Sequence, residues 1–183
     1  MADVIRKNIV LCISGGIAAY KSAMLCSMLA QNGYDVKVVM TANAQEFVTP
    51  LTFQTLSKNE VMTSLWNREV WRPGHVAWAD WADLLLIVPA TANIIGKIAN
   101  GIGDDALSTL AICMKPEAIM LAPAMNPAMW NNVFVQKNVA LLQENGVKFC
   151  GPADGHVACG EGGSGRMEEP QTIFDAVEKY FGK

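Results

Sequence analysis

The sequence is short of charged residues, of histidine and of cysteine pairs. Charged side chains make up 17% of the 183 residues, whereas a typical soluble domain has about 25%. Because 51% of the residues are hydrophobic, the composition excludes intrinsic disorder. The two histidines, His75 and His156, have no metal-binding spacing, and the five cysteines form no CxxC pair. We therefore expect neither a zinc site nor a disulfide framework.

Signals for membranes and nucleic acid are also lacking. No run of about 18 apolar residues occurs without polar interruption, so we expect no membrane span. The net charge of −3 provides no basic surface for nucleic acid. The first residues run directly into a strand-like segment and lack the apolar stretch of a signal peptide. These absences lead us to expect a cytoplasmic protein with no membrane or nucleic-acid partner.

Apolar residues are more frequent than one small core requires. We expect part of the excess to lie in a subunit interface or in a large ligand pocket. A tryptophan cluster, Trp66, Trp71, Trp78 and Trp81, surrounds His75 in the sequence. We interpret these side chains mainly as core or interface anchors, because aromatic residues dominate the energetics of both.

Short apolar runs alternate with segments of helical spacing. Four runs have the pattern of strands buried on both faces, and they span residues 8–14, 36–40, 84–89 and 118–123, with a shorter last strand at 147–150. Helices are expected over residues 18–31, 93–99, 105–114, 128–145 and 170–181.

This alternation predicts a single α/β domain over residues 1–183 with a doubly wound parallel sheet. We expect a flavodoxin-like or Rossmann-like three-layer sandwich, with right-handed crossovers and a site at the carboxyl ends of the strands. Residues 151–169 are rich in glycine and have no apolar periodicity, so we expect a long loop there. Loops of that length in compact domains are usually functional or disordered.

The first strand leads into a turn that favours a phosphate group. The residues SGGIAAYK at 14–21 bring small residues to a helix start, where backbone N–H groups bind anions. The GxGxxG spacing is absent, and the second strand ends at Met40 and Thr41 without the acid that binds the ribose of NAD. A mononucleotide therefore fits better than a dinucleotide. The alternative is that Gly15 and Gly16 only form a tight turn.

The exits of two later strands have a similar character. Residues 88–97 and 123–130 place small and polar residues at helix starts, which lets a flat ring or a phosphate approach the backbone. Asn126 precedes Pro127 and is expected to cap the following helix, which by itself would explain the asparagine. Because three such exits meet at one edge of the sheet, they predict a site there.

Four segments resemble the homo-oligomeric flavin-containing cysteine decarboxylase family: GGIAAYK at 15–21, PATAN at 89–93, PAMN at 123–126 and ACGEGGSGRM at 158–167. The resemblance runs from about Lys7 to the C-terminus. The last segment resembles the members that act on 4′-phosphopantothenoyl-cysteine in coenzyme A biosynthesis. The chain stops before any phosphopantothenoylcysteine synthetase domain, so it is similar to the stand-alone form.

The resemblance implies a carboxy-lyase that depends on FMN, with FAD as the alternative flavin. The flavin would oxidise the CH2–SH group of the substrate to a thioaldehyde, CO2 would leave, and the enethiolate would be reduced to 4′-phosphopantetheine. The flavin would be contacted by residues at the ends of the strands and by two apolar residues, Ile17 and Phe47. These residues are Gly15, Gly16, Ile17, Thr41, Phe47, Ala90, Thr91, Ala92, Asn93 and Ala124.

The motifs of the family also match three catalytic positions. His75 would assist thiol deprotonation or orient the substrate, Asn126 would hold the substrate carboxylate, and Cys159 would protonate the enethiolate. Each position has a plainer interpretation, since a lone histidine is often structural and a free cysteine is often a buried hydrophobe. Met129 and Arg166 are the further substrate contacts that we expect.

The resemblance also implies an oligomer. Family members form trimers with flavin and substrate bound between subunits, and some trimers assemble into dodecamers. We expect the tryptophan cluster to contribute to such an interface, and residues 151–169 to close over the substrate. Several relatives have a basic residue where this chain has Asp80, so the substrate phosphate must be bound by other groups. A separate synthetase is a further expected partner.

Two other functions within this resemblance stay open. One is a non-catalytic flavoprotein subunit that regulates a phosphatase, although this chain has no acidic tail and retains His75, Asn126 and Cys159. The other is a decarboxylase of peptides that end in cysteine, against which the segment 158–167 argues.

Overall fold

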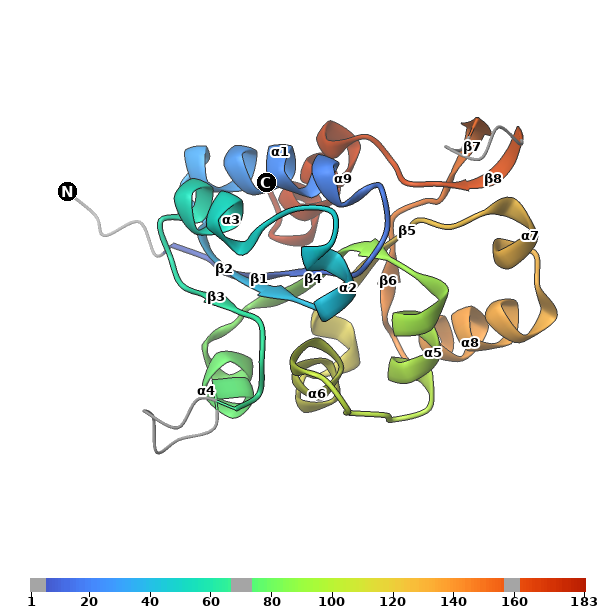
Figure 1. The fold of residues 1–183 in the computed structure, drawn as a ribbon, viewed down its shortest axis with the longest axis horizontal. Helices are drawn as coiled ribbons and strands as arrows, with labels where there is room; N and C mark the ends of the chain where they lie inside the picture. The colour runs from blue at the N-terminus through green and yellow to red at the C-terminus, as the bar shows by residue number, and fades with distance from the viewer. Residues whose placement is uncertain (1–5, 67–73, 157–161) are drawn as a thin grey trace.

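The computed structural model describes residues 6–66, 74–156 and 162–183 (Figure 1). The strands are β1 (Asn8–Ile13), β2 (Asp35–Met40), β3 (Val61–Met62), β4 (Leu84–Ala90), β5 (Ile119–Pro123), β6 (Lys148–Phe149), β7 (Ala153–His156) and β8 (Gly162–Arg166). The helices are α1 (Ala19–Gln31), α2 (Ala42–Gln45), α3 (Pro50–Ser57), α4 (Gly74–Trp81), α5 (Ala92–Ala99), α6 (Ala106–Cys113), α7 (Pro127–Trp130), α8 (Val133–Glu144) and α9 (Pro170–Tyr180), with a 3-10 turn at Pro116–Ala118. Among these described residues, no helix has the length and apolar character needed to cross a bilayer.

The main sheet has six strands in the order β3-β2-β1-β4-β5-β6, and every pair of neighbours is parallel. This is the order of the doubly wound dinucleotide-binding fold. The expectation of a single α/β domain with a parallel sheet is therefore confirmed.

Burial on both faces explains why the central strands are apolar throughout. Every residue of β4 is buried, and so is every residue of β1 after Asn8. Successive side chains of a strand point to opposite faces, so Ile9 and Leu11 join one core whereas Val10 and Cys12 join the other. Both cores need a helical layer to cover them.

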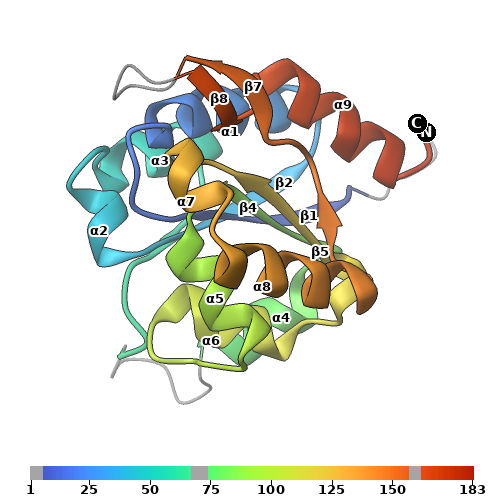
Figure 2. The same cartoon turned by 90° about the vertical axis from the view of Figure 1, so that its right-hand side faces the viewer.

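The helices supply a layer on each face of the sheet. Helices α1, α3 and α9 lie on one face and α4, α5, α6 and α8 on the other (Figure 1), and Figure 2 shows the same layers from the side. The strands β1 and β4 are neighbours, yet α1 follows β1 onto one face and α5 follows β4 onto the other. This is the switch point at which doubly wound folds bind their ligands.

The single helix expected over residues 128–145 is wrong, because two helices occupy this segment. Helix α7 ends at Trp130 and α8 begins at Val133. Between them, Asn132 caps α8, and its side-chain oxygen accepts a hydrogen bond of 2.9 Å from the N–H of Phe134. A side chain that bonds to nearby backbone in this way competes with helical bonding, which explains the break.

The long loop expected over residues 151–169 is instead a β-hairpin in its described part. Strands β7 and β8 pair antiparallel. Gly155, Gly163 and Gly165 have φ angles of 151°, 146° and 147°, which L side chains rarely adopt. A hairpin built from glycine backbone shows no apolar alternation, and its sequence therefore resembles a loop. The residues 157–161 lie outside the described residues.

Short elements fill the stretch between β2 and β4, where sequence patterns predict none. Helix α2 has 4 residues, α3 and α4 have 8 each, and β3 has 2. Helix α2 and strand β3 are too short for a periodicity to be recognised. Helix α3 does have residues typical of helix ends. Pro50 lies in its first turn, and Lys58, which follows its last turn, has the left-handed backbone conformation.

Candidate active site

A cavity of about 470 Å³ lies at the carboxyl edge of the sheet, at the switch point. Its volume is within the range of small-molecule sites. The exits of β1, β2, β4 and β5 form its walls, together with parts of α5, α6 and α7. The lining residues are Ser14, Gly15, Gly16, Thr41, Ala42, Asn43, Thr91, Asn93, Ile94, Lys97, Asp105, Ala124, Met125 and Met129.

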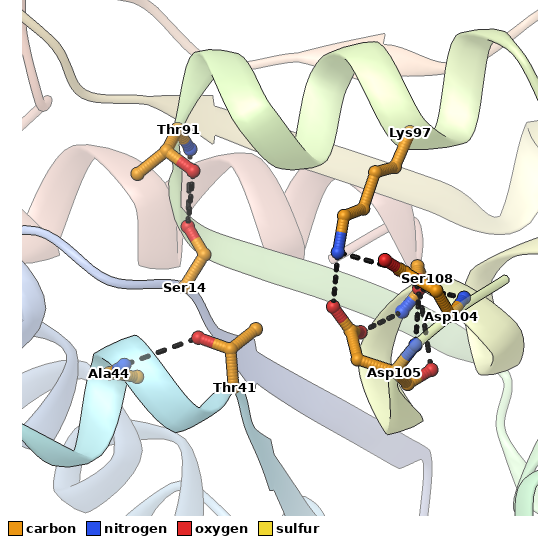
Figure 3. A network of polar contacts seen from close by, with 8 residues as sticks. All are labelled: Ser14, Thr41, Ala44, Thr91, Lys97, Asp104, Asp105 and Ser108. Carbon is orange, nitrogen blue, oxygen red and sulfur yellow. Dashed lines mark hydrogen bonds and ion pairs between the residues drawn. The ribbon is translucent and has the colours of Figure 1, made fainter. Parts of the chain in front are cut away.

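A buried serine joins the two strand exits at the centre of the site (Figure 3). The Ser14 hydroxyl donates a hydrogen bond of 2.7 Å to the carbonyl of Pro89, and it accepts one of 3.2 Å from the N–H of Thr91. The hydroxyl of Thr91 lies 3.1 Å from the same oxygen. These contacts hold the β1 turn against the β4 turn, although the residues are far apart in the chain.

The two glycines of the first turn have different reasons to be glycine. A Cβ atom at Gly15 would lie 2.3 Å from the Cβ of Asn43, so packing against α2 requires glycine there. A Cβ atom at Gly16 would meet only Thr91, at 3.7 Å, and packing within the protein does not require glycine. Because Gly16 lines the cavity, a side chain there would take up ligand space.

The start of the helix that follows this turn has no side-chain cap. Helix α1 has 13 residues, and its N-cap, Ala18, provides no side-chain cap. The N–H groups of Ala19 and Lys21 donate to the carbonyls of Gly16 and Ala18, but the aligned peptide dipoles of a helix start still favour an anion. The residues therefore fit a phosphate group near Gly16.

A charged cluster forms another wall of the cavity (Figure 3). The Lys97 ammonium lies 2.6 Å from the Asp104 carboxylate and 2.7 Å from that of Asp105. Asp105 also caps α6, accepting a hydrogen bond of 2.8 Å from the N–H of Ser108. Burial lowers the pKa of Lys97, but the hydrogen bonds to the two carboxylates outweigh burial and raise it above its ordinary value. The hydrogen bond from Lys97 is the main cause that lowers the pKa of Asp104.

The PAMN segment carries Asn126 beside the cavity, between Met125 and α7. The Asn126 side chain accepts a hydrogen bond of 2.7 Å from the N–H of Ala128, so the predicted helix cap is confirmed. The N–H of Met125 donates a hydrogen bond of 2.9 Å to the carbonyl of Gly165 in β8. A Cβ atom at Gly165 would lie 2.4 Å from the Met125 carbonyl oxygen, so only glycine allows this approach. The hairpin is therefore seated directly on the Asn126 segment.

Most of the residues predicted to hold a cofactor meet at this cavity. Gly15, Gly16, Thr41, Thr91, Asn93 and Ala124 line it, as does the predicted substrate contact Met129. Ala90 is buried in β4 and Ala92 begins α5, whereas Ile17 and Phe47 are 58% and 48% exposed. Sequence reasoning missed the lining residues Ser14, Ala42, Asn43, Ile94, Lys97, Asp105 and Met125.

Arg166 is engaged with a carboxylate on its own segment. It forms an ion pair with Glu169, and Glu169 also pairs with Lys21 of α1 at 2.9 Å. These contacts connect the end of the hairpin to the first turn of α1. The predicted contact between Arg166 and a substrate anion stays a prediction.

His75 does not line the cavity beside Asn126 but a different hollow. Helix α4 carries His75 into a cavity of about 590 Å³ beside β3, and Figure 1 shows α4 and α7 at opposite ends of the molecule. The Nδ1 atom of His75 is buried and has no hydrogen-bond partner among the described residues. One chain therefore does not bring the two predicted catalytic residues together. The third, Cys159, lies outside the described residues.

Of the tryptophans near His75 in the sequence, Trp66, Trp78 and Trp81 line the same hollow as His75. Trp78 is 6% exposed, whereas Trp66 is 85% exposed. The Lys37 ammonium lies 4.9 Å and 4.8 Å from the ring centroids of Trp78 and Trp81, which is the range of cation–π contacts. Trp71 lies outside the described residues.

The parallel sheet and the cavity at its switch point define a ligand-binding α/β domain of the doubly wound class. The chain belongs to the flavoprotein family, because the family model described as Flavoprotein matches residues 3–182. It is similar to the coenzyme A biosynthesis bifunctional protein CoaBC of Bacillus subtilis, with 46% identity over 96% of this chain and 43% of that protein. Its identity with the CoaBC protein of Escherichia coli is 40%, over 96% of this chain and 43% of that protein.

The chain thus spans less than half the length of these curated relatives, which are bifunctional. The expectation of a stand-alone form therefore stays a prediction.

Solved structures of similar length also match. A PPC decarboxylase mutant complexed with pantothenoylaminoethenethiol has 31% identity and a TM-score of 0.86, over 97% of this chain and 100% of that chain. The FMN binding protein AtHal3 has 31% identity and a TM-score of 0.82, over 96% of this chain and 97% of that chain. The peptidyl-cysteine decarboxylase EpiD, at 23% identity and a TM-score of 0.80, shares the fold.

Proposed function

We propose that this domain binds FMN and decarboxylates 4′-phosphopantothenoyl-cysteine to 4′-phosphopantetheine in coenzyme A biosynthesis. The match to a PPC decarboxylase over the full length of that chain carries the proposal. It is supported by a cavity whose lining includes six of the ten residues predicted to hold the flavin. The reaction class is that of a carboxy-lyase.

The residues of the cavity fit FMN. Gly16 and the uncapped start of α1 would hold its phosphate, and the exits at Thr91 and Ala124 would lie against the rest of the molecule. When bound, FMN supplies the reversible oxidation of the CH2–SH group to a thioaldehyde, which makes the loss of CO2 possible.

The protein itself orients the substrate and moves protons. The amide of Asn126 would hold the substrate carboxylate, and its position is set by the cap on α7 and by the hairpin seated behind it. Cys159 would give a proton to the enethiolate. The β7–β8 hairpin would keep water from the site.

His75 would act on the site of a neighbouring subunit in a trimer, or in a dodecamer of trimers. The observation behind this proposal is that His75 lines one hollow of the chain, whereas Asn126 directly follows Met125, which lines the other. Exposed apolar residues such as Trp66 would be covered by the neighbour. Mixing His75→Asn chains with Asn126→Asp chains tests it, because shared sites would regain activity that neither variant has alone. Mixed oligomers that stay inactive would contradict the proposal.

The decisive experiment compares two substrates. The purified protein is incubated with 4′-phosphopantothenoyl-cysteine or with a peptide ending in cysteine, and CO2 and product mass are followed. We expect a yellow protein that acts on the first substrate. Cys159→Ser should bind FMN and release CO2 but stall at an oxidised enethiol product, and His75→Asn should bind FMN without releasing CO2. A colourless protein, or 4′-phosphopantetheine formed by Cys159→Ser at the wild-type rate, would contradict these assignments.

We further propose a cytoplasmic location and a synthetase that supplies the substrate. The synthetase is either a separate protein, as the stand-alone form requires, or part of the same chain, as in CoaBC. The mass of the protein isolated from its native source separates the two arrangements.

A further inference from the structure

Two charged residues line the cavity, and the proposed mechanism uses neither. Lys97 lies on α5, one turn after Asn93, and Asp105 lies at the start of α6. The other described lining residues carry no charge. Figure 3 shows the two side chains across the site from Ser14 and Thr91.

The geometry holds the Lys97 ammonium in one place. Its side chain is 17% exposed, and the two carboxylates lie 2.6 Å and 2.7 Å from it. Asp105 is fixed in turn by the capping box of α6. The wall therefore carries one cation, Lys97, and one anion, Asp105, with the carboxylate of Asp104 behind them.

The charge of Asp105 also acts on a buried group near the end of β1. Burial, and to a smaller extent the charge of Asp105, raises the pKa of the Cys12 thiol. Cys12 is fully buried and lies two residues before Ser14. Charges at such a site act through protein rather than water, so they are weakly screened.

We propose that Lys97 and Asp105 set how easily the bound flavin is reduced, with Lys97 favouring the reduced form and Asp105 opposing it. This inference rests on the proposed function. Two-electron reduction adds negative charge to the flavin ring, and a nearby cation stabilises that charge whereas an anion destabilises it. The pair thereby balances the two halves of a reaction in which the flavin first takes up and then returns a hydride.

The test compares variants of opposite charge. Lys97→Met removes the cation, and Asp105→Asn removes an anion while retaining a residue that caps helices well. Lys97→Arg retains the charge. Lys183→Met is the control, because Lys183 is also paired with a carboxylate, Glu178, but lines neither hollow.

The readouts are the dissociation constant of FMN, from fluorescence quenching, and the midpoint potential of the bound flavin. We expect Lys97→Met to weaken binding of reduced relative to oxidised FMN by about tenfold, which corresponds to a shift of about −30 mV for a two-electron couple. Asp105→Asn should shift the potential in the positive direction. Lys97→Arg and Lys183→Met should stay near the wild-type value.

Shifts of the same sign in Lys97→Met and Asp105→Asn, or no shift in either, would overturn the inference. If Lys97→Met does not fold, the sign of the Asp105→Asn shift decides alone. A wild-type protein that binds no FMN would instead overturn the proposed function, and this inference with it.

Discussion

The contact between the hairpin and the Asn126 segment leads to a sharp prediction for Gly165→Ala. The new Cβ atom would lie 2.4 Å from the Met125 carbonyl oxygen, where ordinary contacts begin at 3.4 Å. Relief requires the strand to move outward by about 1 Å, which stretches the 2.9 Å hydrogen bond from Met125 beyond its useful range. The φ of 147° at Gly165 adds backbone strain.

The magnitude follows from these two losses. One hydrogen bond contributes about 1 kcal/mol, and an unfavourable backbone conformation costs roughly 1–3 kcal/mol. The contact between the hairpin and the Asn126 segment should therefore weaken by about 2–4 kcal/mol. The six-stranded sheet should keep its stability, because β8 does not pair with it. A weakening of 2 kcal/mol exposes the Met125 amide about 30 times more often.

Hydrogen exchange with residue-level resolution measures this effect. In Gly165→Ala we expect the Met125 amide to lose protection at least tenfold, amides of β1 and β4 to be unchanged, and decarboxylation to fall while FMN stays bound. Gly33→Ala is the control, because Gly33 has a positive φ of 86° but no atom within 4 Å of an added Cβ. Undiminished protection at Met125, or an equal loss in the core strands, would refute the reasoning.

Three further predictions concern other contacts of the site. Ser14→Ala leaves the carbonyl of Pro89 without its buried hydrogen-bond donor. It should lower the free energy of unfolding, measured in urea, by roughly 1–3 kcal/mol. A change below about 0.5 kcal/mol would show that this hydrogen bond is dispensable. Hydrogen bonds from Lys21 and then Arg166 lower the pKa of Glu169, so their stabilisation is fully present above the ordinary value of 4.5 and is lost as the pH falls through the lower folded value. The melting-temperature difference between the wild type and Glu169→Gln should accordingly vanish in strong acid, and a difference that grows there would contradict this sign. Trp66→Ser should preserve the circular dichroism spectrum but weaken the oligomer in sedimentation, and an equally stable oligomer would exclude Trp66 from the interface.

Local sequence patterns predicted the central strands of the sheet but not the short elements between β2 and β4 or the β7–β8 hairpin. The apolar runs that became β1, β2, β4 and β5 are long enough to predict buried parallel strands, and their exits predicted the cavity. Lys97 escaped notice because its relation to the site depends on helical phase and on the position of α6, which only the folded chain defines. His75 is the opposite case. Its motif is recognisable in the sequence, but no local pattern indicates that the fold of one chain places it far from Asn126.

The hydrogen bond from Ser14 to Pro89 joins residues that are 75 positions apart, and the cavity has walls from four strands. No fragment of the chain contains this site, so the site forms only when the whole sheet has assembled. Binding and folding are therefore one equilibrium: a ligand at 100 times its dissociation constant adds about 2.7 kcal/mol to the stability of the entire domain. A mutation that destabilises the sheet, however distant from the cavity, should therefore also lower the fraction of protein that holds its cofactor.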